Sequence, residues 1–150
     1  MKRFRFPLES VKTVRGLHEQ RAREAFTAEL RLLEQAEDRL RTAREQRRAL
    51  TDSIVAARSV AFNSGELAAG LNAFHLAVEA ETDAAKARAA ANTRLEQARE
   101  RWMESRRQLE MVHRLEHRAR LEHRESCEKD EQAALDEIAT MNLSRAAAAP

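Results

Sequence analysis

Helix-breaking residues are almost absent from this chain of 150 residues. It contains 3 glycines and 2 prolines, and no proline lies between Pro7 and Pro150. A globular chain with ordinary loops needs more of these turn-forming residues. Aromatic residues make up only 4% of the sequence and charged residues 35%, so large side chains are too few to fill a compact core. The sequence therefore predicts an all-α protein of long helices, forming one domain over residues 1–150.

The first predicted helix runs from about residue 8 to about residue 58, because Pro7 can begin a helix and no later residue breaks it. Its second half carries apolar side chains at alternating spacings of three and four, which is typical of a coiled-coil seam. The seam positions are Leu33, Ala36, Leu40, Ala43, Arg47, Leu50, Ile54, Ala57 and Ala61. The one charged member, Arg47, can pack its stem in the seam while its guanidinium reaches solvent.

A bend is predicted over residues 59–65, the only uncharged and turn-rich interruption. Asn63, followed three residues later by Glu66, fits the start of a second helix over residues 66–141. Its seam positions are Ala84, Ala87, Ala91, Leu95, Ala98, Trp102, Ser105, Leu109 and Val112. Residues 142–150 are expected to be a frayed tail.

A fold at about residue 62 brings together positions whose numbers add up to about 124. The layers would then be Leu33 with Ala91, Leu40 with Ala84, Phe26 with Ala98, and Trp102 with Ala22. A large side chain faces a small one in every layer, as dense packing between helices requires. The predicted architecture is therefore an antiparallel coiled-coil hairpin, a rod about 75 Å long with an acidic extension of the second helix.

Charge is spread unevenly along the chain. Residues 1–48 carry 13 Lys and Arg against 8 Asp and Glu, whereas residues 125–137 carry one Lys against six acids. The basic start of the sequence lacks the apolar run of a signal peptide, and the uncharged stretch at 67–78 is too short to span a bilayer. Cys127 is the only cysteine, which fits a reducing compartment. A cytoplasmic location is expected.

One histidine motif invites a catalytic interpretation. His113, Glu116 and His117 form an H-x-x-E-H pattern, which places two imidazoles on one helix face as in certain zinc hydrolases, with Glu110 one turn earlier. Such enzymes also need a ligand from a separate element and a dry cleft, which a helical hairpin does not offer. We therefore expect solvated histidines, no metal, no cofactor and no catalytic residue.

Arginine-rich faces leave open a nucleic-acid-binding alternative. The arginines are Arg39, Arg41, Arg44, Arg47 and Arg48 in the first helix and Arg99, Arg101, Arg106 and Arg107 in the second. Acidic residues interleave with them, namely Glu37, Asp38, Glu45, Glu100 and Glu104. Such mixing usually indicates a solvated face with intrahelical ion pairs, so nucleic acid is not the expected partner.

An uncharged stretch near the predicted bend has two open interpretations. Leu67, Leu71, Phe74 and Val78 lie on one helix face at spacings of four, three and four. The four side chains could all pack on the first helix as ordinary core. Alternatively, some of them face outward and mark a partner-binding site.

Four segments, taken in order, resemble one known family. They are Phe4–Val11 followed by Arg15, then Leu71–Glu79, Trp102–Leu109 and Asp136–Ala139. With the length and the two-helix layout, they resemble the flagellar export protein FliJ family over essentially the whole chain. That family is related to the YscO-type proteins of virulence injectisomes, whose stalk role is the closest alternative.

The resemblance implies a non-enzymatic component of the flagellar type III export apparatus. Family members form a coiled coil similar to the central stalk of rotary ATP synthases. They sit in the ring of the export ATPase, contact the cytoplasmic domain of the membrane export gate and, in some members, escort export chaperones. The resemblance thus places the protein at the cytoplasmic face of the membrane without direct insertion.

The resemblance also implies two partner sites. In the family, the gate contact uses an aromatic, an aliphatic, a small residue and a histidine, spaced by four, three and four. Phe74 and Val78 fit the first two places, whereas Glu81 and Ala85 do not fit the others. The expected gate site is Leu67, Leu71, Phe74 and Val78, and the expected ATPase site, near both termini, is Arg3, Arg5, Glu128 and Glu131.

Overall fold

The computed structural model describes residues 3–57 and 63–147, without the side chains of residues 143 and 145–147. These ranges contain two α-helices, α1 (Glu9–Ala57) and α2 (Ser64–Ala147), and no strand. The all-α prediction of two long antiparallel helices packed on each other is thereby confirmed. Most of the predicted bend, including the seam position Ala61, lies outside the described residues.

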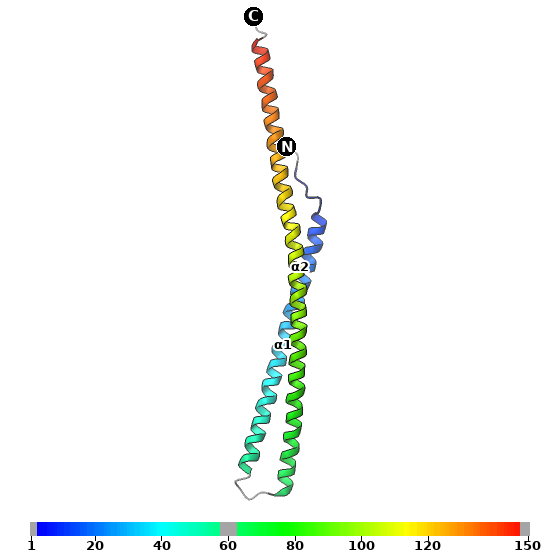
Figure 1. The fold of residues 1–150 in the computed structure, drawn as a ribbon, viewed down its shortest axis with the longest axis vertical. Coiled ribbons are helices and arrows are strands. Elements are labelled where there is room, and N and C mark those ends of the chain that lie inside the picture. The colour runs from blue at the N-terminus through cyan, green and yellow to red at the C-terminus, as the bar shows by residue number, and fades with distance from the viewer. Residues whose placement is uncertain (1–2, 58–62, 148–150) are drawn as a thin grey trace. The chain divides into compact units, whose positions relative to one another are not determined.

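The helices contribute to two compact units. Unit 1 combines Met1–Glu19 with Ser105–Pro150, and unit 2 is Gln20–Glu104. In unit 2 the segment of α1 and the first part of α2 lie side by side and run in opposite directions (Figure 1). Unit 1 likewise pairs the first turns of α1 with a later segment of α2.

Local backbone contacts set both helix starts. The Glu9 amide donates to the Phe6 carbonyl over 3.4 Å, and Glu9 lies in the first turn of α1, where its carboxylate suits the helix dipole. Asn63 caps α2: its side-chain oxygen accepts from the Gly65 amide at 3.1 Å, and its carbonyl accepts from Leu67 at 3.2 Å. This cap starts α2 at Ser64, two residues earlier than the sequence predicts.

The far end of α2 also differs from the expected boundary. The helix continues to Ala147, so most of the predicted tail is helical. Arg145, Ala146 and Ala147 have high helix propensity and extend the last turn.

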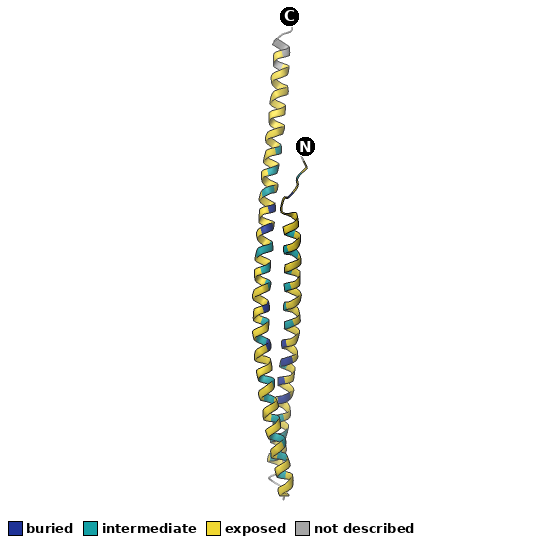
Figure 2. Ribbon diagram, turned by 90° about the vertical axis from the view of Figure 1, so that its right-hand side faces the viewer, coloured by how far each residue is buried: buried dark blue, intermediate teal, exposed yellow. Residues whose placement is uncertain are grey.

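Small residues on both helices build the core of unit 2. Leu33, Ala36 and Ala91 form one buried cluster, against which Leu95 packs, and Ala91 is only 1% exposed. Leu40, Ala43 and Ala98 are buried further along the same seam. Buried positions accordingly lie on the sides of the two helices that face each other (Figure 2). The predicted layer of Leu33 with Ala91 is confirmed.

Two predicted layers of unit 2 are wrong. Phe26 was expected to face Ala98, and Trp102 to face Ala22. Instead the rings of Phe26 and Trp102 stack, with centroids 5.3 Å apart and planes 23° from parallel. Aromatic side chains reach beyond their own helical turn, and a stacked aromatic pair is worth about 0.5–1.5 kcal/mol beyond the area that it buries.

A glycine inside α1 offers a simple stability test. A Cβ built on Gly16 meets no atom within 4 Å. Because glycine in a helix interior costs about 1 kcal/mol relative to alanine, Gly16→Ala should stabilise the protein by roughly that amount in urea unfolding. A loss of stability would mean that the space at Gly16 is needed for another contact.

Candidate functional site

The four residues predicted as the gate site form a stripe along α2 in unit 2. We call Leu67, Leu71, Phe74 and Val78 the apolar stripe. Leu67 and Phe74 are half-buried, whereas Leu71 and Val78 remain 44% and 37% exposed. The stripe is therefore neither fully core nor fully solvated. Part of its surface is available for contact, and its use as a partner-binding site stays a prediction.

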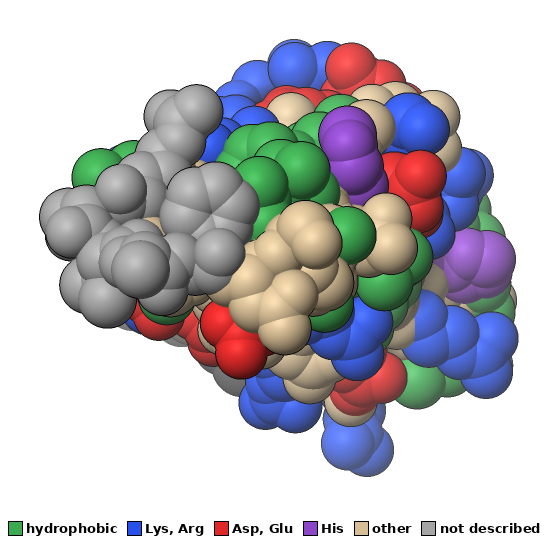
Figure 3. Space-filling model, turned by 90° about the horizontal axis from the view of Figure 1, so that it is seen from below, with side chains coloured by type: hydrophobic (Ala, Val, Ile, Leu, Met, Phe, Trp, Pro, Cys, Tyr) green, Lys and Arg blue, Asp and Glu red, His purple; other side chains and the backbone are tan. Residues whose placement is uncertain are grey.

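The neighbouring residues explain this partial burial. A Cβ built on Gly70 lies 3.6 Å from the Ile54 side chain, so the Gly70 side of α2 faces α1. Leu71 is turned about 100° from Gly70 and lies beside the interface. Seen from the end of unit 2 where α1 ends and α2 begins, hydrophobic side chains gather among charged ones (Figure 3).

A charged cluster adjoins the apolar stripe one turn beyond Val78. Both Arg44 and Arg47 bind Glu81, through Nε to carboxylate distances of 3.3 and 2.5 Å. The hydrogen bond from Arg47 is the main cause that holds the pKa of the Glu81 carboxyl below its ordinary value, with a smaller contribution from Arg44. Glu81 is one of the two positions at which the sequence departs from the family pattern, and here it anchors α2 to α1. Arg47 packs half-buried in the seam, as expected.

In unit 1 the segment before α1 packs against α2. Phe6 is buried, and the ring of Phe4 lies 5.4 Å from that of His123. The Arg120 guanidinium lies 5.6 Å from the centre of the Phe4 ring, within cation–π range. These contacts were not predicted from the sequence. The alternation of Phe4 and Phe6 with arginine just before Pro7 was the available signal.

A buried carboxylate fixes the register of unit 1. Glu116 is the one buried charged residue among those described, and it binds Lys12 at 3.0 Å and Arg120 at 2.5 Å. Hydrogen bonds from Lys12 and then Arg120 lower the pKa of Glu116, and the hydrogen bond to Glu116 is the main cause that raises the pKa of Lys12. A second contact between the helices, from Arg15 to Gln108, supports the same register.

These shifts predict how the stability of the protein depends on pH. Because folding lowers the pKa of Glu116, its contribution is fully present above the ordinary value of 4.5 and is lost as the pH falls through the lower folded-state value. Glu116→Gln should therefore lower the melting temperature at pH 7. The difference in melting temperature between this variant and the unmodified protein should become smaller below pH 4.5. The exposed Glu122→Gln is the control, and an equal response of both variants would contradict the assignment.

All four residues predicted for the ATPase site are exposed in unit 1. These are Arg3, Arg5, Glu128 and Glu131. Every described side chain of α2 from residue 128 to residue 142 is exposed as well, including Leu135, Ile138 and Met141. Within unit 1 this acidic part of α2 has no α1 segment packed on it.

The histidine motif is occupied by other interactions. Glu116 holds Lys12 and Arg120, with the Nδ1 atom of His113 4.0 Å from its carboxylate. Glu110 binds Arg114 at 2.5 Å, and this hydrogen bond lowers the pKa of the Glu110 carboxyl. The described part of the chain contains no group of three His, Cys, Asp or Glu residues arranged to hold a metal ion.

Many arginines on the faces considered for nucleic acid are paired with carboxylates. Arg41 binds Asp38 at 2.7 Å, and Arg44 and Arg47 both bind Glu81, at 3.3 and 2.5 Å. These pairs fit a solvated helical face with interleaved charges.

The fold and these surfaces define an all-helical protein of antiparallel paired helices that presents side chains for contact. The sequence model described as "Flagellar FliJ protein" matches residues 4–148, and the chain therefore belongs to the FliJ family, a component of the flagellar export apparatus. No curated protein and no solved structure matches the chain. Among the described residues, no helix combines the length and the apolar character needed to cross a membrane.

Proposed function

We propose that this protein is a non-enzymatic coiled-coil component of flagellar type III export that acts as a stalk in the export ATPase ring. It also links the ring to the membrane export gate and escorts export chaperones. It works in the cytoplasm, held at the membrane face by the apparatus. The observation that carries this proposal is the partly exposed apolar stripe on α2, in a chain whose family match spans residues 4–148.

The apolar stripe is the proposed contact with the cytoplasmic domain of the gate. Contiguous exposed apolar side chains mark interaction sites on soluble proteins. Leu71 and Val78 supply surface that a partner can bury, and the half-buried Leu67 and Phe74 hold the stripe against α1. Since an α-helical scaffold keeps these side chains at fixed spacing, little conformational entropy is lost when a partner binds.

The proposed ATPase contact lies in unit 1. Arg3 and Arg5 supply positive charge, and Glu128 and Glu131 belong to the acidic, exposed segment of α2. Opposite charges on one end can steer and orient docking against a ring whose charge is complementary. Both units are built from the same two continuous helices, which supports one antiparallel coiled-coil domain over residues 1–150.

Co-purification with each partner separately tests the two contacts. The unmodified protein should bind both the export ATPase and the cytoplasmic domain of the gate. Reversing the charges of Arg3, Arg5, Glu128 and Glu131 together should weaken binding to the ATPase alone. Failure of both partners to co-purify, or equal losses with both partners, would contradict the proposal.

A further inference from the structure

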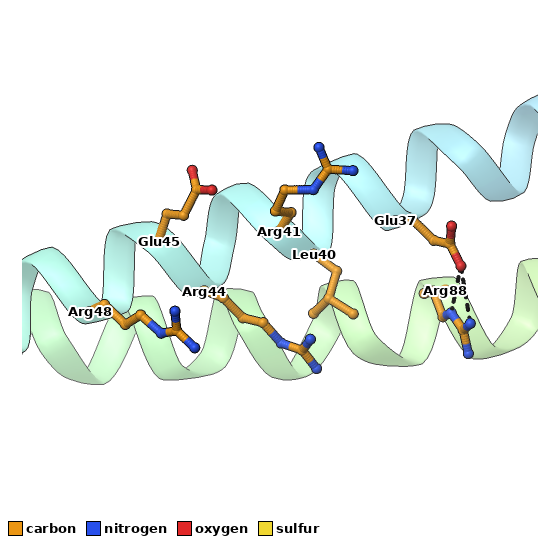
Figure 4. Close-up of a pocket in the computed structure, with 7 residues that line it drawn as sticks. All are labelled: Glu37, Leu40, Arg41, Arg44, Glu45, Arg48 and Arg88. Carbon is orange, nitrogen blue, oxygen red and sulfur yellow. Dashed lines mark hydrogen bonds and ion pairs between the residues drawn. The ribbon is translucent and has the colours of Figure 1, made fainter.

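A basic groove in unit 2 has no role in the function proposed above. It has a volume of about 490 Å³ and is formed mainly by α1, with one residue from α2. Its lining is Glu37, Leu40, Arg41, Arg44, Glu45, Arg48 and Arg88. Arg44 and Arg48 extend from α1 over α2, whereas Arg41 and Glu45 extend away from α2 at the outer edge (Figure 4). Leu40, which is buried, points toward α2 between Arg44 and Arg88 (Figure 4).

The arginines of this groove are unequally engaged. Arg88 is held by Glu37 at 3.0 Å, and Arg44 shares Glu81 with Arg47. Arg48, by contrast, forms no ion pair with any residue that the structure describes, and it is exposed. The groove therefore offers at Arg48 a guanidinium without an ion pair to the described residues, next to Arg44, which shares Glu81 with Arg47.

The groove continues the apolar stripe. Arg48 follows Arg44 by four residues on α1, and Val78 precedes Glu81 by three on α2, so each lies on the same face as its neighbour. Because Arg44 binds Glu81 and the helices are antiparallel, both steps lead in the same direction along unit 2. Arg48 and Val78 thus lie at the same level along unit 2, and the charged groove borders the apolar stripe there.

We infer that this composite surface binds an amphipathic helix with acidic residues, and that this is the chemistry of the partner segment at the apolar stripe. Carboxylates one turn apart on the bound helix would meet Arg44 and Arg48, which are themselves one turn apart. From the level of Arg48 onward, apolar side chains of the same helix would cover Val78 and then Leu71. The assignment to the gate rests on the proposed function, whereas the acidic character follows from the groove.

The groove favours protein over nucleic acid. Glu37 and Glu45 belong to its lining and would repel a continuous phosphate backbone, whereas discrete carboxylates on a helix can avoid them. Exposed leucine and valine beside the arginines suit apolar side chains better than a sugar–phosphate chain. Helix-in-groove recognition combines these apolar and charged contacts in a single bound element.

Binding of synthetic helical peptides to the full chain tests the inference. One peptide carries leucines on two turns followed by glutamates one turn apart, and a second has the reverse order, since the direction of binding is open. Each has a counterpart with glutamine in place of glutamate. We expect at least one acidic peptide to bind about tenfold more tightly than its glutamine counterpart, as two exposed ion pairs allow, with a preference that falls with salt.

Charge-reversal variants assign that preference to the groove. Arg48→Glu should abolish the preference for glutamate, because it places a negative charge where the peptide carboxylate would bind. The variant should still fold, because Arg48 forms no ion pair with a residue that the structure describes. Arg31→Glu is the matched control, an exposed arginine of α1 outside the groove lining, and it should change nothing. Circular dichroism checks that both variants keep their helicity.

Equal binding of glutamate and glutamine peptides, or a preference that survives Arg48→Glu, would overturn the inference. So would tighter binding of a single-stranded oligonucleotide that competes with the peptide. If the acidic peptide binds at Arg48 but the gate domain does not co-purify, the inference stands and the proposed function fails. If the gate domain binds with no role for Arg48, the inference alone fails.

Discussion

Replacing Leu33 by alanine should destabilise the protein by about 2–3 kcal/mol, near the lower end of measured losses for buried leucines. Leu33 is 9% exposed and lies in the cluster with Ala36 and Ala91. The two alanines of the cluster, Ala36 on the same helix and Ala91 on α2, cannot fill the space that the lost atoms leave. Two helices also have no further layer that could collapse into the gap. Urea unfolding followed by circular dichroism measures the loss.

The adjacent residue provides a matched control. Leu32 has the same side chain on the same helix but is 44% exposed. Leu32→Ala should change stability by less than about 0.5 kcal/mol, because alanine has high helix propensity and little burial is lost. Equal losses of stability at positions 32 and 33 would contradict the seam assignment. A large loss only at position 32 would place the seam on the face of α1 that carries Leu32.

Changing Leu71 and Val78 together to glutamine should weaken binding to the cytoplasmic domain of the gate by roughly tenfold to a hundredfold. Full burial of one such side chain against a partner is worth about 1.5–3 kcal/mol. Because both side chains are substantially exposed in the isolated protein, the change should leave its helicity and melting temperature almost unaltered. Isothermal titration or surface plasmon resonance gives the affinity.

Leu76 makes this test specific. It is 66% exposed, more than Leu71 or Val78, but lies on another side of α2 from the apolar stripe. Leu76→Gln should therefore leave the affinity unchanged. Equal losses from Leu76→Gln would show a general effect of surface polarity. Phe74→Ala should also weaken binding, and since Phe74 is half-buried its melting temperature has to be measured alongside.

The sequence predicts the helix seam well for a physical reason. Two long helices can bury only one narrow face, so apolar residues must recur at spacings of three and four. Leu33, Leu40, Ala91 and Ala98 were all identified in this way and are all buried. The helix start at Asn63 was also readable, because a cap depends on local hydrogen bonds rather than on distant packing.

Features that depend on the partner helix were harder to predict. Hydrophobic periodicity does not indicate that Glu116 is buried, since the carboxylate is tolerated only because Lys12 and Arg120 bind it. The contacts of Phe4 and Phe6 come from an irregular segment with no period to interpret. The stack of Phe26 on Trp102 depends on ring directions that spacing alone does not fix.

The partial exposure of the apolar stripe could be predicted only in part from the sequence. Its spacing placed the four residues on one face, but which of them contact α1 depends on the register of the hairpin. The close approach of Gly70 to Ile54 sets that register locally and leaves Leu71 and Val78 at the edge of the interface. The packing pattern by itself assigns this edge no role, and its contact with the gate is our proposal for a chain of the FliJ family.

The hydrolysis rate of the purified export ATPase, measured with increasing amounts of this protein, tests the proposed stalk function most directly. The rate should rise and saturate at a fixed ratio of the two proteins, and the variant with reversed charges at Arg3, Arg5, Glu128 and Glu131 should need a higher concentration to reach the same rate. The protein alone should hydrolyse no ATP. An unchanged ATPase rate, together with no co-purification of the two proteins, would contradict the proposed role.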